Sequence, residues 1–113
     1  CDALLGAAGL GDIGIYFPEG ELKWKGINSL TLLSEVSKML TARQYRVVNL
    51  DSVIIAERPR VAPHVNAMKK NIADCLVISE DCVNIKATTN EKVGFIGREE
   101  GIAAQAVCTI EHD

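Results

Sequence analysis

The sequence predicts one domain of the α/β class, an α+β sandwich in which helices pack on one face of a small mixed β-sheet. Segments with apolar residues at helical spacing alternate with β-branched segments, as such a sandwich requires. A chain of 113 residues is too short to form two independent cores. Its 48% hydrophobic and 24% charged residues are typical of a globular domain and not of a disordered chain.

The first half of the chain is expected to hold two helices separated by a loop. Residues 2–10 are rich in Ala and Leu and close with glycines, as the last turns of a helix and its cap do. Residues 11–26 are punctuated by glycines and show no sustained period, which predicts a long loop. Residues 29–43 have apolar side chains at helical spacing, with Asn28 or Ser29 as the N-cap.

The second half is expected to hold three strands and one helix. Residues 45–56 are β-branched and end just before Pro59, which predicts a strand. Residues 63–77 return to helical spacing, with Pro63 in the first turn. Residues 82–88 alternate apolar and polar side chains and predict a second strand. Residues 102–111 predict a third strand, although several alanines give this segment helix propensity as well.

Composition argues against several classes of protein. The net charge of −3, without a basic stripe, argues against a nucleic-acid partner. No apolar run reaches membrane-spanning length and no signal-peptide pattern opens the chain, so we expect a soluble protein with no membrane partner. The four cysteines form no C-x-x-C pair and have no histidine cluster nearby, which favours free thiols in a reducing cytosol over a zinc finger.

Residues 86–101 carry the chemistry that stands out most. Two hydroxyls (Thr88, Thr89) and a carboxylate (Glu91) come where a strand should end, and a glycine-punctuated loop with one cation, Arg98, follows. Hydroxyls, backbone amides, a carboxylate that can bind metal and a guanidinium together suit a phosphate ligand. On spacing alone, a polar turn between two strands is an equally good interpretation.

The wording of this segment, K-A-T-T-N-E-K-V-G-F-I-G-R-E-E-G, closely resembles the signature of the 2-C-methyl-D-erythritol 2,4-cyclodiphosphate synthase family. Three other stretches match the same family in the same order: D-A-L-L-G-A-A-G-L-G-D-I-G at residues 2–14, F-P at 17–18, and I-I-A-E-R-P-R at 54–60. The resemblance therefore runs from the first residue almost to the last.

The resemblance implies a lyase of the non-mevalonate isoprenoid pathway. Such an enzyme cyclises 4-diphosphocytidyl-2-C-methyl-D-erythritol 2-phosphate and releases cytidine monophosphate (CMP). It also implies zinc, Mg²⁺ or Mn²⁺ as cofactors, a homotrimer with active sites between subunits, and a location in the bacterial cytoplasm or a plastid-type organelle. The alternative is a non-catalytic module on the same scaffold, which binds a nucleotide or oligomerises without turnover.

The resemblance assigns the catalytic roles to Thr89 and Glu91. Thr89 matches a hydroxyl that stabilises the transition state, and Glu91 matches the ligand of a Mg²⁺ or Mn²⁺ that bridges the α- and β-phosphates. A hard carboxylate oxygen suits either ion. Thr88 and Asn90 lie in the same motif as substrate contacts, with Asn90 where a threonine is expected.

Three further groups of substrate contacts follow from the resemblance. An extended, proline-stiffened segment is expected to recognise cytidine through its backbone: Ala56, Glu57, Arg58, Pro59, Arg60, Val61 and Ala62. Arg98 and Phe95 match contacts near the phosphates and the hydrocarbon part of the ligand, although Phe95 could instead fold under to cover the core. Contacts with the erythritol moiety are expected from Asp12, Ile13, Gly14, Phe17, Pro18, Glu19, Gly20 and Glu21.

The family's zinc ligands, an Asp-x-His pair and a histidine on a helix, match nothing in this sequence. His64 and His112 are its only histidines, and neither matches a metal ligand. Since the first helix also has no N-cap residue, we expect the chain to be truncated. It would then lack the N-terminal strands, the start of the first helix and the zinc ligands.

Overall fold

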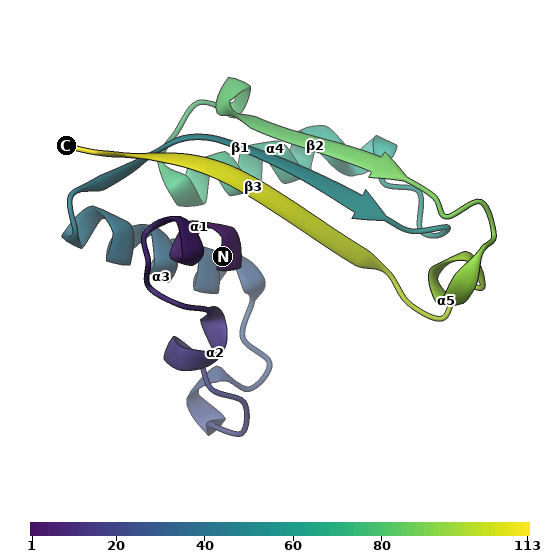
Figure 1. The fold of residues 1–113 in the computed structure, drawn as a ribbon, viewed down its shortest axis with the longest axis horizontal. Helices are drawn as coiled ribbons and strands as arrows, with labels where there is room; N and C mark the ends of the chain where they lie inside the picture. The colour runs from purple at the N-terminus through teal and green to yellow at the C-terminus, as the bar shows by residue number, and fades with distance from the viewer.

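The structure is a computed structural model that describes all of residues 1–113, and its strands form one mixed sheet in the order β2–β1–β3. The central strand β1 (Tyr45–Ile55) pairs in parallel with β2 (Val83–Thr88) and antiparallel with β3 (Ala103–His112). The three predicted strands and the mixed sheet are thus confirmed (Figure 1). Cys82, predicted to open a strand, instead ends the short 3₁₀ turn Glu80–Cys82.

Two longer helices cover one face of this sheet: α3 (Ser29–Ala42) and α4 (Val65–Leu76). In Figure 1, α4 lies behind the strands and α3 lies below β3. The side chain of Asn28 caps α3 by accepting a hydrogen bond from the Leu30 amide at 2.8 Å, as expected of an N-cap asparagine. The short helix α1 (Asp2–Ala7) packs against α3 and β3. Helices on one face of a small mixed sheet are the predicted α+β architecture.

The structure adds short helical turns to segments that the sequence predicted as loops. Residues 11–26 contain α2 (Ile13–Tyr16) and the 3₁₀ turn Leu22–Trp24, and the glycine-punctuated loop contains α5 (Gly94–Gly97). Pro63 lies in a separate 3₁₀ turn (Ala62–His64) ahead of α4. One helical turn is too short to show a hydrophobic period, so the pattern could not reveal these elements.

The core is aliphatic, because the few aromatic residues lie at its margin. Leu4, Leu5, Val36, Leu40 and Val83 are the largest fully buried side chains. They come from α1, α3 and β2, so the core brings together segments that are far apart in the sequence. The four cysteines are free and partly buried. None of the helices is both long and apolar enough to cross a membrane.

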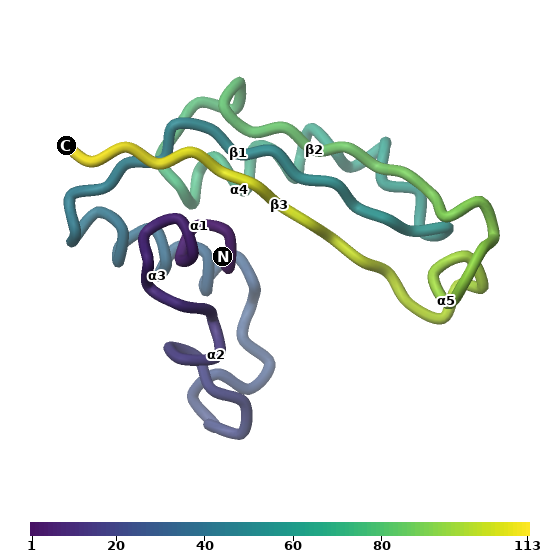
Figure 2. The backbone as a smooth tube through the Cα atoms, viewed as in Figure 1, coloured from purple at the N-terminus to yellow at the C-terminus, as the bar shows by residue number.

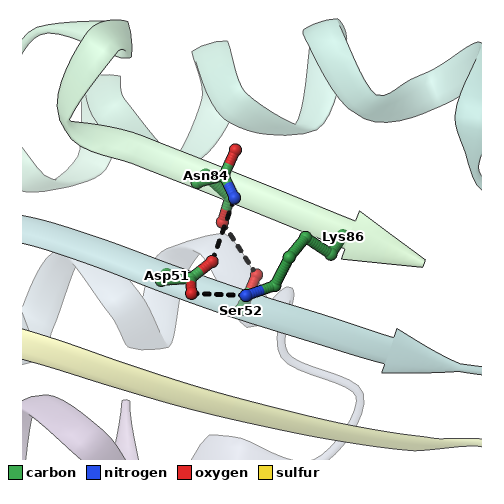
Figure 3. A network of polar contacts seen from close by, with 4 residues as sticks. All are labelled: Asp51, Ser52, Asn84 and Lys86. Atoms are coloured by element: carbon green, nitrogen blue, oxygen red, sulfur yellow. Dashed lines mark hydrogen bonds and ion pairs between the residues drawn. The ribbon is translucent and has the colours of Figure 1, made fainter. Parts of the chain in front are cut away.

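The opposite face of the sheet is not covered by helices and carries a polar network (Figure 3). The ammonium of Lys86 on β2 donates to Asp51 on β1 at 2.5 Å, and the amide of Asn84 donates to the same carboxylate at 3.1 Å. The hydrogen bond from Lys86, and then that from Asn84, hold the pKa of Asp51 below its ordinary value. The charges of this face therefore neutralise each other within the sheet.

Replacing Val77 with glycine is expected to stabilise the protein by about 1 kcal/mol. Val77 ends α4 with a left-handed backbone (φ 56°, ψ 48°), and its side chain is 87% exposed. A β-branched residue is strained there, whereas glycine is not, and little packing is lost. The free energy of unfolding in urea measures the effect. Glycine at exposed Val107 in β3 serves as the control, and a loss of stability in both variants would contradict the explanation.

Candidate active site

Two predicted site segments meet where the parallel strands β1 and β2 end. Ile55 pairs with Thr88, and the Ala56 amide donates to the Thr88 carbonyl at 3.0 Å. Residues 56–62 therefore lie beside Thr88 and Thr89, although about 30 residues separate them in the sequence. Together they line a small cavity of about 170 Å³: Ala56, Glu57, Pro59, Arg60, Val61, Ala62, Ala87, Thr88 and Thr89. The segment expected to recognise cytidine thus adjoins the hydroxyls expected to contact phosphate.

A tight turn after β2 presents the carboxylate of Glu91 to solvent. The Thr89 hydroxyl accepts a hydrogen bond from the Glu91 amide at 3.2 Å, and the Val93 amide donates to the Asn90 carbonyl at 2.9 Å. Glu91 and Lys92 both have left-handed backbones, with φ of 51° and 64°. A left-handed conformation costs about 1 kcal/mol or more for a residue other than glycine, so other contacts must stabilise the turn.

Two such contacts come from outside the turn. The carboxylate of Glu57, which follows β1, accepts a hydrogen bond from the Lys92 amide at 2.6 Å. Gly97, buried in α5, packs directly on the backbone of Lys92, where a Cβ would lie 2.7 Å from the Lys92 Cα. One contact comes from the end of β1 and the other from α5, and together they fix the turn. The carboxylate of Glu91 therefore projects from a backbone whose position is fixed.

Arg98 and Phe95 are both exposed on the loop that follows Glu91. Arg98 pairs with Glu100 at 2.9 Å on the exposed surface, where such a pair is weak enough to exchange for a phosphate. Phe95 is 57% exposed, so the alternative that its ring folds under to cover the core is wrong. Arg58 pairs with Glu99 at 3.5 Å and so links the segment after β1 to the one after α5.

The residues expected to contact erythritol lie in another part of the chain. Asp12 precedes α2 and is exposed, and the carboxylate of Asp2 accepts a hydrogen bond from the Ile13 amide at 2.9 Å. Phe17 stacks edge-on against Trp24, with ring centroids 4.8 Å apart. A cavity of about 470 Å³ lies here: Phe17, Pro18, Glu19, Gly20, Glu21, Leu22, Trp24, Lys25, Ile27 and Leu32.

The two groups of predicted residues are not brought together within one chain. The segment around α2 and the segment around α5 lie at separate extremes of the molecule (Figure 2). Phe17–Glu21 line one cavity, whereas Ala56, Glu57 and residues 59–62 line another. A single copy therefore keeps the two groups of candidate residues apart.

The donors at the turn fit a hard divalent cation better than zinc. Glu91 offers carboxylate oxygens, and hydroxyl oxygens of Thr88 and Thr89 lie in the same segment. Mg²⁺ prefers such oxygen donors and binds through one or two carboxylates together with water and substrate phosphates. No three His, Cys, Asp or Glu side chains in the structure lie close enough to hold a metal by themselves.

The sequence pattern missed two groups that shape this site. Glu57 was expected only as part of a backbone-reading segment, but its side chain reaches the Lys92 amide. Gly97 was one of several loop glycines, and only the structure shows that its missing side chain makes room for Lys92. The spacing of Gly94 and Gly97 in V-G-F-I-G is the one signal that could have suggested a close backbone approach.

The model of the YgbB family matches residues 1–111. The chain is 56% identical over 110 residues to a 2-C-methyl-D-erythritol 2,4-cyclodiphosphate synthase from Chlorobium luteolum, covering 97% of this chain and 70% of that protein. The synthase of Thioalkalivibrio sulfidiphilus is also 56% identical, over 98% of this chain and 69% of its own length.

Solved structures show the same fold. The bifunctional IspDF of Campylobacter jejuni superposes with a TM-score of 0.95 at 40% identity, over 99% of this chain and 30% of that longer chain. IspF of Plasmodium falciparum in a CDP complex superposes with a TM-score of 0.86 at 31% identity, over 98% of this chain and 66% of that one. Family model, sequence and fold agree along nearly the whole sequence, and the chain belongs to the YgbB family.

Proposed function

We propose that this chain carries the reaction of 2-C-methyl-D-erythritol 2,4-cyclodiphosphate synthase, a phosphorus–oxygen lyase. The observation that carries the proposal is the shared cavity where β1 and β2 end, which sets residues 56–62 against Thr88 and Thr89. Identities of 52–56% to synthases along most of their length support it. None of these relatives is described as a non-catalytic module, so the comparisons favour the enzyme over that alternative.

The reaction needs positioning more than a protein nucleophile. An oxygen of the substrate's 2-phosphate attacks the β-phosphorus, the bond from that phosphorus to the bridging oxygen breaks, and CMP leaves with that oxygen. Holding the three groups in line can supply about 7–11 kcal/mol of the barrier. We assign the cytidine end to residues 56–62, because all of them except Arg58 line the cavity beside Thr88 and Thr89. The segment is not extended throughout as expected, since it bends at residues 57–59 and enters a 3₁₀ turn at Ala62.

Thr89 is suited to stabilise the transferred phosphoryl group. A threonine hydroxyl has one donor hydrogen and two acceptor lone pairs. One lone pair accepts from the Glu91 amide, which leaves the hydrogen free to donate to a phosphate oxygen. A fixed donor aimed at developing negative charge is the type of group that lowers the barrier most.

We assign Glu91 as the residue that would hold a Mg²⁺ or Mn²⁺ ion together with the substrate. When bound, the ion neutralises charge that develops on the phosphate oxygens. Glu91 is exposed and close to the hydroxyls, as a ligand shared with a substrate must be. The zinc ion implied by the resemblance has no ligand set among these residues, and we place none of them in its site.

We propose that the active site is completed by neighbouring copies in a homotrimer. One chain separates the residues expected to contact erythritol from those expected to contact the phosphates, and a second copy can supply the missing half. The uncovered face of the sheet is suited to contact such a copy, because its Asp51–Lys86 pair is internally neutralised and Val107 beside it is exposed. Location in the cytoplasm or a plastid-type organelle stays a prediction.

The full-length protein is expected to convert the cytidine diphosphate substrate to the cyclic diphosphate and CMP in equal amounts. Phosphorus NMR follows both products, with Mg²⁺ present and then with EDTA added. Removal of the metal should stop the formation of both products together, because neither forms without charge neutralisation at the β-phosphate. Absence of CMP, or CMP formed together with a linear phosphate, would contradict the proposed reaction.

A further inference from the structure

The turn that carries Glu91 is held from outside by a single side-chain hydrogen bond. Glu91 and Lys92 are consecutive residues with left-handed backbones, and both are exposed. Within the turn, Thr89 satisfies the Glu91 amide. The next amide, that of Lys92, is satisfied by Glu57, which lies 35 residues earlier in the chain.

This hydrogen bond is of the strong kind. Its length is 2.6 Å, and its acceptor is a carboxylate, so it is charge-assisted. Glu57 is half-buried, which limits the competition from water. Arg58 and Glu99, which form an ion pair between the same two segments, are both exposed. The hydrogen bond from Lys92 to Glu57 therefore restrains the turn more than the Arg58–Glu99 ion pair does.

We propose that Glu57 is a positioning residue that fixes the Lys92 backbone and thereby aims the Glu91 carboxylate at the divalent cation. The proposal rests on the function proposed above for Glu91. Glu57 also belongs to the segment assigned to cytidine, and its backbone follows directly from Ala56, which is hydrogen-bonded to Thr88. Nucleotide and cation are therefore coupled through one residue, so each is expected to tighten the binding of the other.

The test compares Glu57→Ala with Glu57→Gln in the full-length protein. Glutamine keeps an acceptor oxygen for the Lys92 amide, whereas alanine removes it. Glu80→Ala is the matched control, because Glu80 is an exposed glutamate at the opposite end of β2. Hydrogen exchange at the Lys92 amide reports on the bond itself. Electron paramagnetic resonance of free Mn²⁺, with CDP present, reports the affinity for the cation.

In Glu57→Ala we expect faster exchange at Lys92 and an Mn²⁺ affinity about tenfold weaker, the usual size of effect for a group that orients a metal ligand. Glu57→Gln should restore both to within about threefold of the unchanged protein, and Glu80→Ala should alter neither. Unchanged exchange and affinity in Glu57→Ala would overturn the proposal. So would a Glu57→Gln variant as impaired as Glu57→Ala, because charge and not the hydrogen bond would then matter.

A failure of the proposed function gives a different result. If the unchanged protein binds no Mn²⁺ in the presence of CDP, the assignment of Glu91 to a cation fails before any variant is compared. The exchange rate at Lys92 would still show whether Glu57 holds the turn, but the positioning role toward a cation would be overturned with the cation site.

Discussion

Replacing Glu91 with glutamine is expected to lower the rate of CMP release by about 100-fold or more, equivalent to about 2.7 kcal/mol of transition-state stabilisation. Glutamine keeps the size of the side chain and removes its charge, so the turn should persist while the affinity for Mg²⁺ falls. Steady-state rates over a range of Mg²⁺ concentrations measure the effect, which excess Mg²⁺ should restore only in part.

The control for this prediction is Glu80→Gln, which makes the same change at an exposed position away from the two strand ends. Its rate and its Mg²⁺ dependence should match those of the unchanged protein. Normal turnover by Glu91→Gln at low Mg²⁺ would show that the cation is held elsewhere.

Replacing Gly97 with alanine is expected to impair both stability and catalysis. The added Cβ would lie 2.7 Å from the Lys92 Cα, inside the contact distance of two carbon atoms, and α5 or the turn would have to move. Overpacking of this kind costs about 1–3 kcal/mol of unfolding free energy. Because the displaced backbone carries Glu91, we expect CMP release to fall by at least about tenfold as well, since small misplacements of catalytic groups are costly.

Gly6→Ala separates this effect from a general intolerance of alanine. Gly6 lies in α1, and a Cβ there would meet no atom within 4 Å. Alanine should leave stability unchanged or raise it by about 0.5–1 kcal/mol, as it does in helix interiors. Urea unfolding and CMP release, measured on both variants, test the comparison. Equal losses in the two variants would contradict the role given to Gly97.

The longer helices and the strands could be predicted because the hydrophobic period of each repeats several times along its length. In α3 the apolar spacing and the Asn28 cap agree, and in β1 the β-branched run ends near a proline. The strand order, with β1 between β2 and β3, could not be predicted, because no local signal in the sequence specifies which strands pair. Elements of one turn, such as α2 and α5, gave no period to detect.

The residue types of the candidate site could be predicted, but their arrangement could not. Thr88, Thr89 and Glu91 stand out because hydroxyls and a carboxylate follow a strand. That Glu57 faces the same turn depends on the parallel register of β1 and β2, which a single sequence does not encode locally. The left-handed conformation of Glu91 was also hidden, because residues other than glycine rarely adopt it.

The separation between the residues expected to contact erythritol and those expected to contact the phosphates could not be predicted from the sequence either. Residues around Asp12 and around Glu91 match one family pattern, yet α2 and α5 lie at separate extremes of the chain. Sequence order gives no distance between segments that pack on different elements. The resemblance implied a site shared between subunits, and the separation within one chain supports that proposal.

A crystal structure of the full-length protein with CDP and Mn²⁺, with the metal located by its anomalous scattering, tests the proposed cation and nucleotide sites most directly. We expect Mn²⁺ about 2.1 Å from a carboxylate oxygen of Glu91 and in contact with the diphosphate. The cytosine should lie against the backbone of residues 56–62, with Thr89 facing a phosphate oxygen. Mn²⁺ bound away from Glu91, or CDP held in the cavity beside Phe17 and Trp24, would contradict it.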